Sequence, residues 1–153
     1  MTSNRFCNRC AAVLLAILAG AASLASWADV NSTLVPFVTS LKGSAETVAF
    51  TGNARIDTQV ILDNVLGNAP VMEIVVDMSG VSGVGASTGS SYSISGPAII
   101  HRPLAPNDLI RVTFPFYRGS DLFGAETVEA TFTCKFDTAT GAVTAVKLTT
   151  LKM

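Results

Sequence analysis

Few residues of this chain could do chemistry, and the single histidine is the first to consider. His101 ends an alternating segment on its polar side and is followed by Arg102 and Pro103. A general base or metal ligand needs a nucleophile or further ligands beside it, and the sequence has no second histidine. An enzyme would have to bring His101 together with a carboxylate such as Asp108 or Glu126. We expect an exposed surface histidine and no catalytic residue.

Three cysteines offer thiol chemistry, but none of them predicts a reactive site. Cys134 shares one face of an alternating segment with Phe132 and Phe136, and burial among apolar side chains raises a thiol pKa. Cys7 and Cys10 have the spacing of a redox or metal pair, yet they lie in a segment that we expect to be removed. The remaining cysteine has no partner for a disulfide within the chain.

Two further patterns resemble binding sites but lack essential parts of them. The small-residue stretch 80–89 follows a strand as phosphate-binding loops do, but another strand follows it and it contains no Lys. We interpret it as a flexible hairpin connection or a flat sheet edge. The acidic turns, Asp63–Asn64 with Asn68 and Asp121 with Glu126, lack the spaced loop that supplies calcium with roughly six to eight oxygens. We therefore predict no cofactor and no metal.

Exposed aromatic rings, which sugar-binding β-domains use as stacking platforms, are scarce in this sequence. Only Tyr117 and Phe123 are expected to face outward, and the single tryptophan, Trp27, lies near the N-terminus. This scarcity argues against a lectin-type site. The outward Thr and Ser residues more simply supply β-propensity and solubility.

The N-terminal segment has the pattern of a secretory signal peptide. Arg5 and Arg9 form a positive region, residues 11–25 are apolar, and residues 26–28 offer a small-x-small cleavage site. The apolar run of about 15 residues is shorter than the roughly 20 that span a bilayer. We expect cleavage after Ala28, with cleavage after Ala25 as the alternative, and export to the periplasm, the cell surface or the medium.

Length and charge restrict the remaining chain further. Loss of residues 1–28 would remove two of ten basic and none of eleven acidic residues, which leaves 125 residues with a formal charge of −3. A domain of this length buries roughly two thirds of its unfolded surface. Its Lys and Arg residues do not cluster, which argues against nucleic acid as a partner. No second apolar run follows, so we expect no membrane span in the mature chain.

From residue 46 to residue 153 apolar and polar residues alternate, and the apolar ones fall almost always on even numbers. Val48, Phe50 and Ile56, for example, share one face of the first segment. Such alternation is typical of antiparallel strands that are buried on one side. Gly52 suggests a bend or a split, and Gly96–Pro97 a bulge or an edge position. The expected strands are 47–62, 71–79, 92–100, 109–117, 127–136 and 142–151, the last two joined by a tight turn at 137–141.

The segment 29–45 allows two structures. It could form a short helix that begins after Thr33, or an extended arm that pairs with a sheet edge, as in exported β-proteins that assemble by strand addition. The residues that would share one face of the helix are Leu34, Phe37, Val38 and Leu41.

The sequence therefore predicts a signal peptide (1–28), an N-terminal arm or short helix (29–45) and an all-β domain (46–153). We expect a single antiparallel meander of six to seven strands that forms a sandwich or a barrel. The function that fits is a non-enzymatic exported domain that acts in binding or assembly, with a protein partner or with copies of itself. A carrier of a small apolar ligand is the alternative, and an enzyme that uses His101 comes third.

Overall fold

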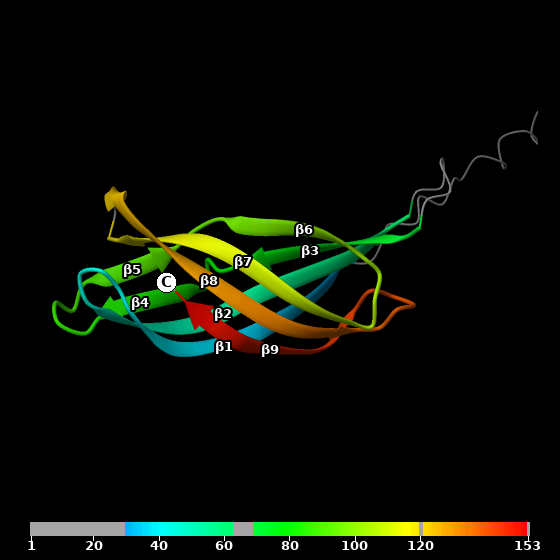
Figure 1. Cartoon of the computed structure of the whole chain (residues 1–153), viewed down its shortest axis with the longest axis horizontal. Helices are drawn as coiled ribbons and strands as arrows, with labels where there is room; N and C mark the ends of the chain where they lie inside the picture. Colours follow the sequence, from blue (N-terminus) through cyan, green and yellow to red (C-terminus); the bar gives the residue numbers. More distant parts are fainter. Residues whose placement is uncertain (1–29, 63–68, 120, 153) are drawn as a thin grey trace, which may run out of the picture.

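The computed structural model describes residues 30–62, 69–119 and 121–152, with the backbone alone at 121–123. Within these residues the protein is all-β, as predicted, and its strands form one antiparallel sheet with the order β6-β3-β2-β4-β5-β7-β8-β9 (Figure 1). β1 is not part of this order and pairs with β2. The strands are β1 (Asn31–Lys42), β2 (Thr47–Ile61), β3 (Val71–Asp77), β4 (Val81–Gly85), β5 (Ser91–Ile94), β6 (Pro97–Pro103), β7 (Asn107–Arg118), β8 (Asp121–Phe136) and β9 (Val143–Lys152).

Several predictions concern parts of the chain outside the described residues. The signal peptide at 1–28, with Cys7 and Cys10, is one of them, and the turn residues Asp63–Asn64 and Asn68 are another. Among the residues that are described, no helix is long and apolar enough to cross a membrane.

The described residues form nine strands, more than the six or seven expected, because the N-terminal segment is a strand, β4 forms where a connection was expected, and the expected strand 92–100 is divided into β5 and β6. In the sheet, β3 with β4 and β5 with β6 act as two long strands that are each broken in two. β3 pairs with the second half of β2, and β4 pairs with its first half. β6 and β5 continue this arrangement by pairing with β3 and β4. The interpretation of the stretch 80–89 as a flexible hairpin connection or a flat sheet edge was wrong for residues 81–85, which form β4 between β2 and β5.

Glycines mark both breaks. β2 runs unbroken through Gly52, and the break falls in its partner between β3 and β4, where the Asn53 N–H donates to the Gly80 carbonyl at 3.2 Å. Gly52 has a φ of 138°, and a Cβ there would collide with this same carbonyl oxygen. Gly96, with a φ of 86°, separates β5 from β6. β6 is the end strand of the sheet order, which is the edge position that Gly96–Pro97 suggested as the alternative to a bulge.

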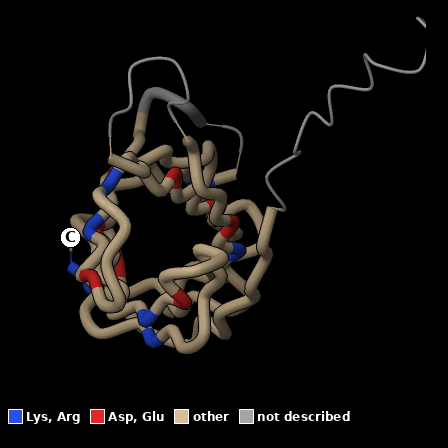
Figure 2. Tube along the Cα trace, turned by 90° about the vertical axis from the view of Figure 1, so that its right-hand side faces the viewer, with Lys and Arg blue, Asp and Glu red and all other residues tan. Residues whose placement is uncertain are grey.

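The sheet curls around its long axis, so that the Cα trace encircles the core (Figure 2). Phe50 on β2 and Phe116 on β7 are three strand spacings apart, which is about 14 Å on a flat sheet. Their ring centroids nevertheless lie 5.5 Å apart, edge to face, because the two strands face each other across the interior. The predicted inward residues that are buried are Val48, Phe50, Ala54, Ile56, Met72, Ile74, Val76, Met78, Tyr92, Ile94, Ile110, Val112, Phe114, Phe116, Val128, Ala130, Phe132, Cys134 and Phe136.

The N-terminal segment is extended, and the helical alternative was wrong. β1 pairs antiparallel with β2 of the same chain along its whole length. Val35 and Phe37 are buried in the core, whereas Leu34 and Val38 face outward with 63% and 81% of their surface exposed. A nearly continuous apolar run fits a helix and a strand equally well, so the sequence pattern alone could not decide.

The sheet is open, which corrects the expectation of a sandwich or a closed barrel. β9 comes next to β1. In the turn before β9, the Thr140 carbonyl accepts from Asn31 Nδ2 on β1 at 3.4 Å, and the Gly141 carbonyl accepts from the buried Thr58 Oγ1 on β2 at 2.8 Å. In the described part of the chain, however, the sheet order includes no ladder between β1 and β9. One sheet therefore encloses the core on its own.

Candidate functional site

His101 is exposed on the outer face of β6, as predicted. Its Nε2 lies 2.9 Å from Oε2 of Glu73 on β3, and Gln59 Nε2 on β2 donates to the other oxygen of Glu73 at 2.6 Å. The three side chains form a polar row across three strands. This row joins the edge strand β6 to its neighbours on the surface of the sheet.

The carboxylates considered as partners for His101 have other contacts. Asp108 lies 3.5 Å from Arg102 Nε and links the start of β7 to β6. Glu126 on β8 accepts from the Ser44 hydroxyl at 2.6 Å and from the Ser44 N–H at 3.0 Å. The structure therefore does not bring either carboxylate to His101.

Cys134 belongs to the core, as predicted. Its side chain is fully buried on β8, and this burial, with a smaller contribution from the negative charge of Asp108, raises its pKa to about 12. The thiol is therefore protonated at neutral pH and shielded from reagents.

The stretch 80–89 forms an interior strand and a tight turn, so it is neither a flexible connection nor an edge. β4 lies between β2 and β5 in the sheet. A Cβ at Gly83 would collide with the side chains of Val48 and Phe50, and a Cβ at Gly85 would collide with the carboxylate of Glu46. Glycine is required here because the core and a buried carboxylate occupy the space of a side chain.

Glu46 is a site that sequence reasoning missed. It is buried at the entrance to β2, and its Oε2 accepts from the N–H groups of Ser87 and Thr88, both at 3.0 Å. Its Oε1 accepts from the Thr88 and Tyr92 hydroxyls at 2.6 and 2.9 Å. These hydrogen bonds, that of the Thr88 hydroxyl above all, lower its pKa from 4.5 to about 2, although burial opposes them. The turn after β4 does bind an anion, and that anion is the chain's own carboxylate.

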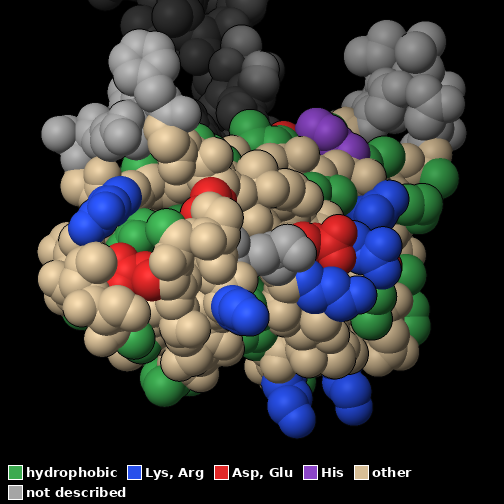
Figure 3. All heavy atoms as spheres, turned by 60° about the vertical axis from the view of Figure 1, so that its left-hand side comes forward, with side chains coloured by type: hydrophobic (Ala, Val, Ile, Leu, Met, Phe, Trp, Pro, Cys, Tyr) green, Lys and Arg blue, Asp and Glu red, His purple; other side chains and the backbone are tan. Residues whose placement is uncertain are grey.

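The remaining predicted sites give little more. In the described residues no group of three or more His, Cys, Asp and Glu side chains is arranged to hold a metal ion. Tyr117 is half-buried on β7, and the side chain of Phe123 lies outside what is described. Acidic and basic side chains are interspersed on the face seen in Figure 3, and they form no field of one sign there.

The most unusual feature is a gap in the sheet between β6 and β7, which we call the β6/β7 gap. β5 pairs with the end of β7, and the Ser95 N–H donates to the Pro115 carbonyl at 3.4 Å. Beyond this point β6 pairs only with β3, and the first part of β7 pairs only with β8. Most Cα atoms of β6 lie more than 8 Å from every Cα atom of β7. Arg102 and Asp108 bridge the far end of the gap.

The backbone of β7 turns unpaired groups toward this gap. The N–H and C=O of one strand residue point the same way, and the direction alternates along the strand. Because the Pro115 carbonyl points toward β5, the backbone groups of Thr113, Arg111 and Leu109 point toward β6. The Leu109 N–H is bonded to its neighbouring Asp108 side chain at 2.7 Å. The N–H groups of Arg111 and Thr113 have no partner within the described residues.

Prolines line the other side of the β6/β7 gap. Pro97 and Pro103 begin and end β6, and a proline within a sheet is placed so that its missing N–H faces the unpaired side. Ile99 and His101, like the two prolines, are odd-numbered positions of β6. Their backbone N–H and C=O groups therefore also point toward the gap. The outer rim carries two exposed apolar side chains, Ile99 on β6 at 60% and Leu109 on β7 at 50% exposure.

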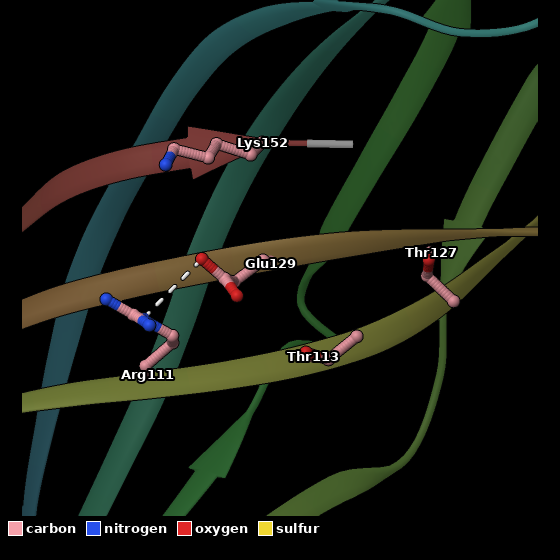
Figure 4. A pocket seen from close by; sticks show the side chains of 5 residues that line it. All are labelled: Arg111, Thr113, Thr127, Glu129 and Lys152. Atoms are coloured by element: carbon pink, nitrogen blue, oxygen red, sulfur yellow. Dashed lines mark ion pairs between the residues drawn. The ribbon is translucent and has the colours of Figure 1, made fainter.

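Among the described residues, two of the hollows lie on the outer face of the sheet, away from the core, and are lined mainly by polar side chains. The larger, of about 450 Å³, spans β7, β8 and β9 and is lined by Arg111, Thr113, Thr127, Glu129 and Lys152 (Figure 4). The smaller, of about 270 Å³, spans β1 to β3. It contains Arg55, whose guanidinium pairs with Asp57 at 3.1 Å and with Asp77 at 3.3 Å. Asp57 and Asp77 are therefore both already paired with Arg55.

In comparisons with known proteins, no protein family model, no curated protein and no solved structure matches the chain.

Proposed function

We propose that the chain is an exported, non-enzymatic domain that binds an extended segment of a partner protein by strand addition in the β6/β7 gap. The unpaired N–H groups of Arg111 and Thr113, directed across the gap at β6, are the observation that carries the proposal. An extended peptide can complete such an edge with main-chain hydrogen bonds, and pockets for alternate side chains then give specificity. Export remains an expectation from the signal pattern in residues 1–28.

The gap also defines the segment that would fit. β6 has seven residues, and Pro97 and Pro103 limit the donors that it offers to Ile99 and His101 between them. β6 and β7 run antiparallel to each other. A strand inserted between them would therefore be parallel to one of them and antiparallel to the other. Its inward side chains would meet the partly buried Ala98 and Ile100. A short segment with apolar residues at alternate positions is therefore the expected ligand.

The other two functions have weaker support. A carrier needs an apolar space, but the inward side chains pack against one another, as the contact between Phe50 and Phe116 illustrates, and both hollows described above are outside the core and lined mainly by polar side chains. An enzyme based on His101 needs a nucleophile beside it. The contacts of His101 are those of a surface link between strands.

The test is a selection of random ten-residue peptides, displayed on phage, against the purified protein. Selected peptides should alternate apolar with polar residues, and adding one to ¹⁵N-labelled protein should slow amide exchange at Arg111 and Thr113. Thr113→Pro removes one N–H donor from the gap and leaves the ladder with β8 intact, since that ladder uses the even-numbered residues of β7. We expect this variant to lose at least tenfold in peptide affinity, because a main-chain hydrogen bond in a water-excluded edge is lost with its donor.

Thr113→Val is the matched control, because it keeps the N–H and the strand conformation. Thermal melts of both variants report whether the fold survives. Peptides that bind Thr113→Pro as well as the parent protein, or that leave exchange at Arg111 and Thr113 unchanged, would contradict strand addition.

A further inference from the structure

The larger outer hollow carries a second inference, which does not depend on the β6/β7 gap. From the free polar groups that converge there, we propose that the hollow of Arg111, Thr113, Thr127, Glu129 and Lys152 binds a sugar unit that bears a carboxylate. Figure 4 shows these five side chains on three neighbouring strands around one shallow space.

The register of the sheet places these five residues close together on neighbouring strands. Thr113 on β7 is the Cα partner of Glu129 on β8, which in turn is the partner of Lys152 on β9. Arg111 lies two residues before Thr113 on the same face, and Thr127 two residues before Glu129. The four side chains of β7 and β8 point to the same side of the sheet because positions of equal parity share a face. Lys152 joins them as the cross-strand partner of Glu129, since a register shift between Thr131 and Phe132 changes the parity of the outward residues on β9.

Most of the hydrogen-bonding capacity in the hollow is unused. Arg111 Nε lies 3.6 Å from Oε1 of Glu129, and its two terminal nitrogens form no hydrogen bond among the described residues, so they can form the planar fork that a carboxylate fits. Lys152, Thr113 and Thr127 have no side-chain partner among the described residues. Two cations and one acid give the hollow a local charge of +1 in a chain whose net charge is negative.

Glu129 selects the kind of anion. Its carboxylate is on β8, between the strands that carry Arg111 and Lys152, so a bare multivalent anion such as phosphate would meet a like charge. A ligand with one carboxylate and several hydroxyls reduces this conflict, since its single charge can pair with Arg111 or with Lys152 while a hydroxyl donates to Glu129. The threonine hydroxyls can bond to further sugar oxygens. All five residues that line the hollow are polar or charged, so each offers a hydrogen-bonding group to a polar ligand.

The experiment is a ¹H–¹⁵N NMR titration of the full chain with glucuronate, with glucose, acetate and inorganic phosphate as comparison ligands. Glucuronate should shift the amides of Thr113, Thr127 and Glu129 with a dissociation constant in the millimolar range, as expected for a small, exposed site. Glucose and acetate should each bind at least about fivefold more weakly, because each lacks one of the two recognised groups. Phosphate should bind more weakly than glucuronate.

The variants separate this site from general attraction to surface cations. Arg111→Gln with Lys152→Gln should weaken glucuronate at least tenfold, whereas Lys147→Gln should leave it unchanged. Lys147 is an exposed lysine on the same face of β9, opposite Thr133, and it does not line the hollow. Equal loss in the Lys147 variant, equal binding of glucuronate and acetate, or no saturable shift at these amides would overturn the proposal. None of these results bears on strand addition, which is read from amide exchange with peptides.

Discussion

The two ends of β7 differ in their pairing. The C-terminal end is hydrogen-bonded to a strand on each side, whereas the N-terminal end is paired on one side only. Near Phe116 the strand has partners on both sides, an aromatic contact with Phe50, and the Glu46 network close by. Near Arg111 it has a partner on one side only. The protein thus has enough stabilising contacts to complete its sheet at one end, and we infer that the open end serves a partner and not the fold.

The largest expected effect tests the completed end. Phe50→Ala removes a fully buried ring that packs on Phe116 and should reduce the free energy of unfolding by about 3–5 kcal/mol. Ile99→Ala, at the rim of the β6/β7 gap, should change it by no more than about 0.5 kcal/mol. Urea unfolding followed by circular dichroism measures both. Similar losses would mean that the two regions contribute alike to stability.

The Glu46 network should give the next largest effect. Glu46→Gln replaces one acceptor oxygen by an amide NH2 group that faces N–H and O–H donors, so it should lower the melting temperature more than Glu126→Gln, whose carboxylate is more exposed. The folded pKa of Glu46 is about 2 and its ordinary value is 4.5. A group with a lowered pKa stabilises the folded state above its ordinary value and loses that effect as the pH falls toward the folded value.

The melting temperature of the parent protein should therefore fall between about pH 4.5 and pH 2, and part of that fall should be absent in Glu46→Gln. Melting curves across this range, with Glu126→Gln as control, measure it. A parallel fall in the parent and in Glu46→Gln would show that another carboxylate is responsible.

Amide exchange sharpens the comparison along a single strand. Val112 and Phe114 point their N–H groups to β8, whereas Arg111 and Thr113 point theirs into the gap. In the free protein we expect the second pair to exchange at least roughly tenfold faster than the first, because only the first is held by the ladder. NMR-detected exchange into deuterated buffer measures the four rates. Equal protection would show that β6 and β7 pair in solution.

The smallest expected effect concerns the link that holds β6. His101→Ala removes the contact with Glu73 on an exposed surface, and such pairs contribute at most about 1 kcal/mol to stability. Chemical unfolding should detect a loss within that limit. Exchange at the β6 amides should nevertheless increase locally. A loss as large as that of Phe50→Ala would assign His101 a structural role that its exposure does not explain.

Alternation was sufficient to predict the inward face of the sheet, because a period of two places every second residue in the core and the chain keeps an even register through Phe50, Ile74 and Phe114. It could not predict β4, since Gly83 and Gly85 give no hydrophobic signal where a neighbour fills the space of a side chain. It could not find Glu46, whose partners follow it by about forty residues. The sequence could not predict the β6/β7 gap either, because the pattern within one strand does not specify which strand pairs with it.

The prolines around the β6/β7 gap have a consequence for the solubility of the protein. Exposed strand edges promote fibril growth, in which each added chain copies the hydrogen bonds of the previous one. Pro97, Pro103 and Pro115 interrupt that template, since none of them can donate, and they leave only a short run of donors between them. An edge shortened in this way offers too few donors to serve as a template for repeated addition of chains, and its length matches the single short segment that we propose it binds.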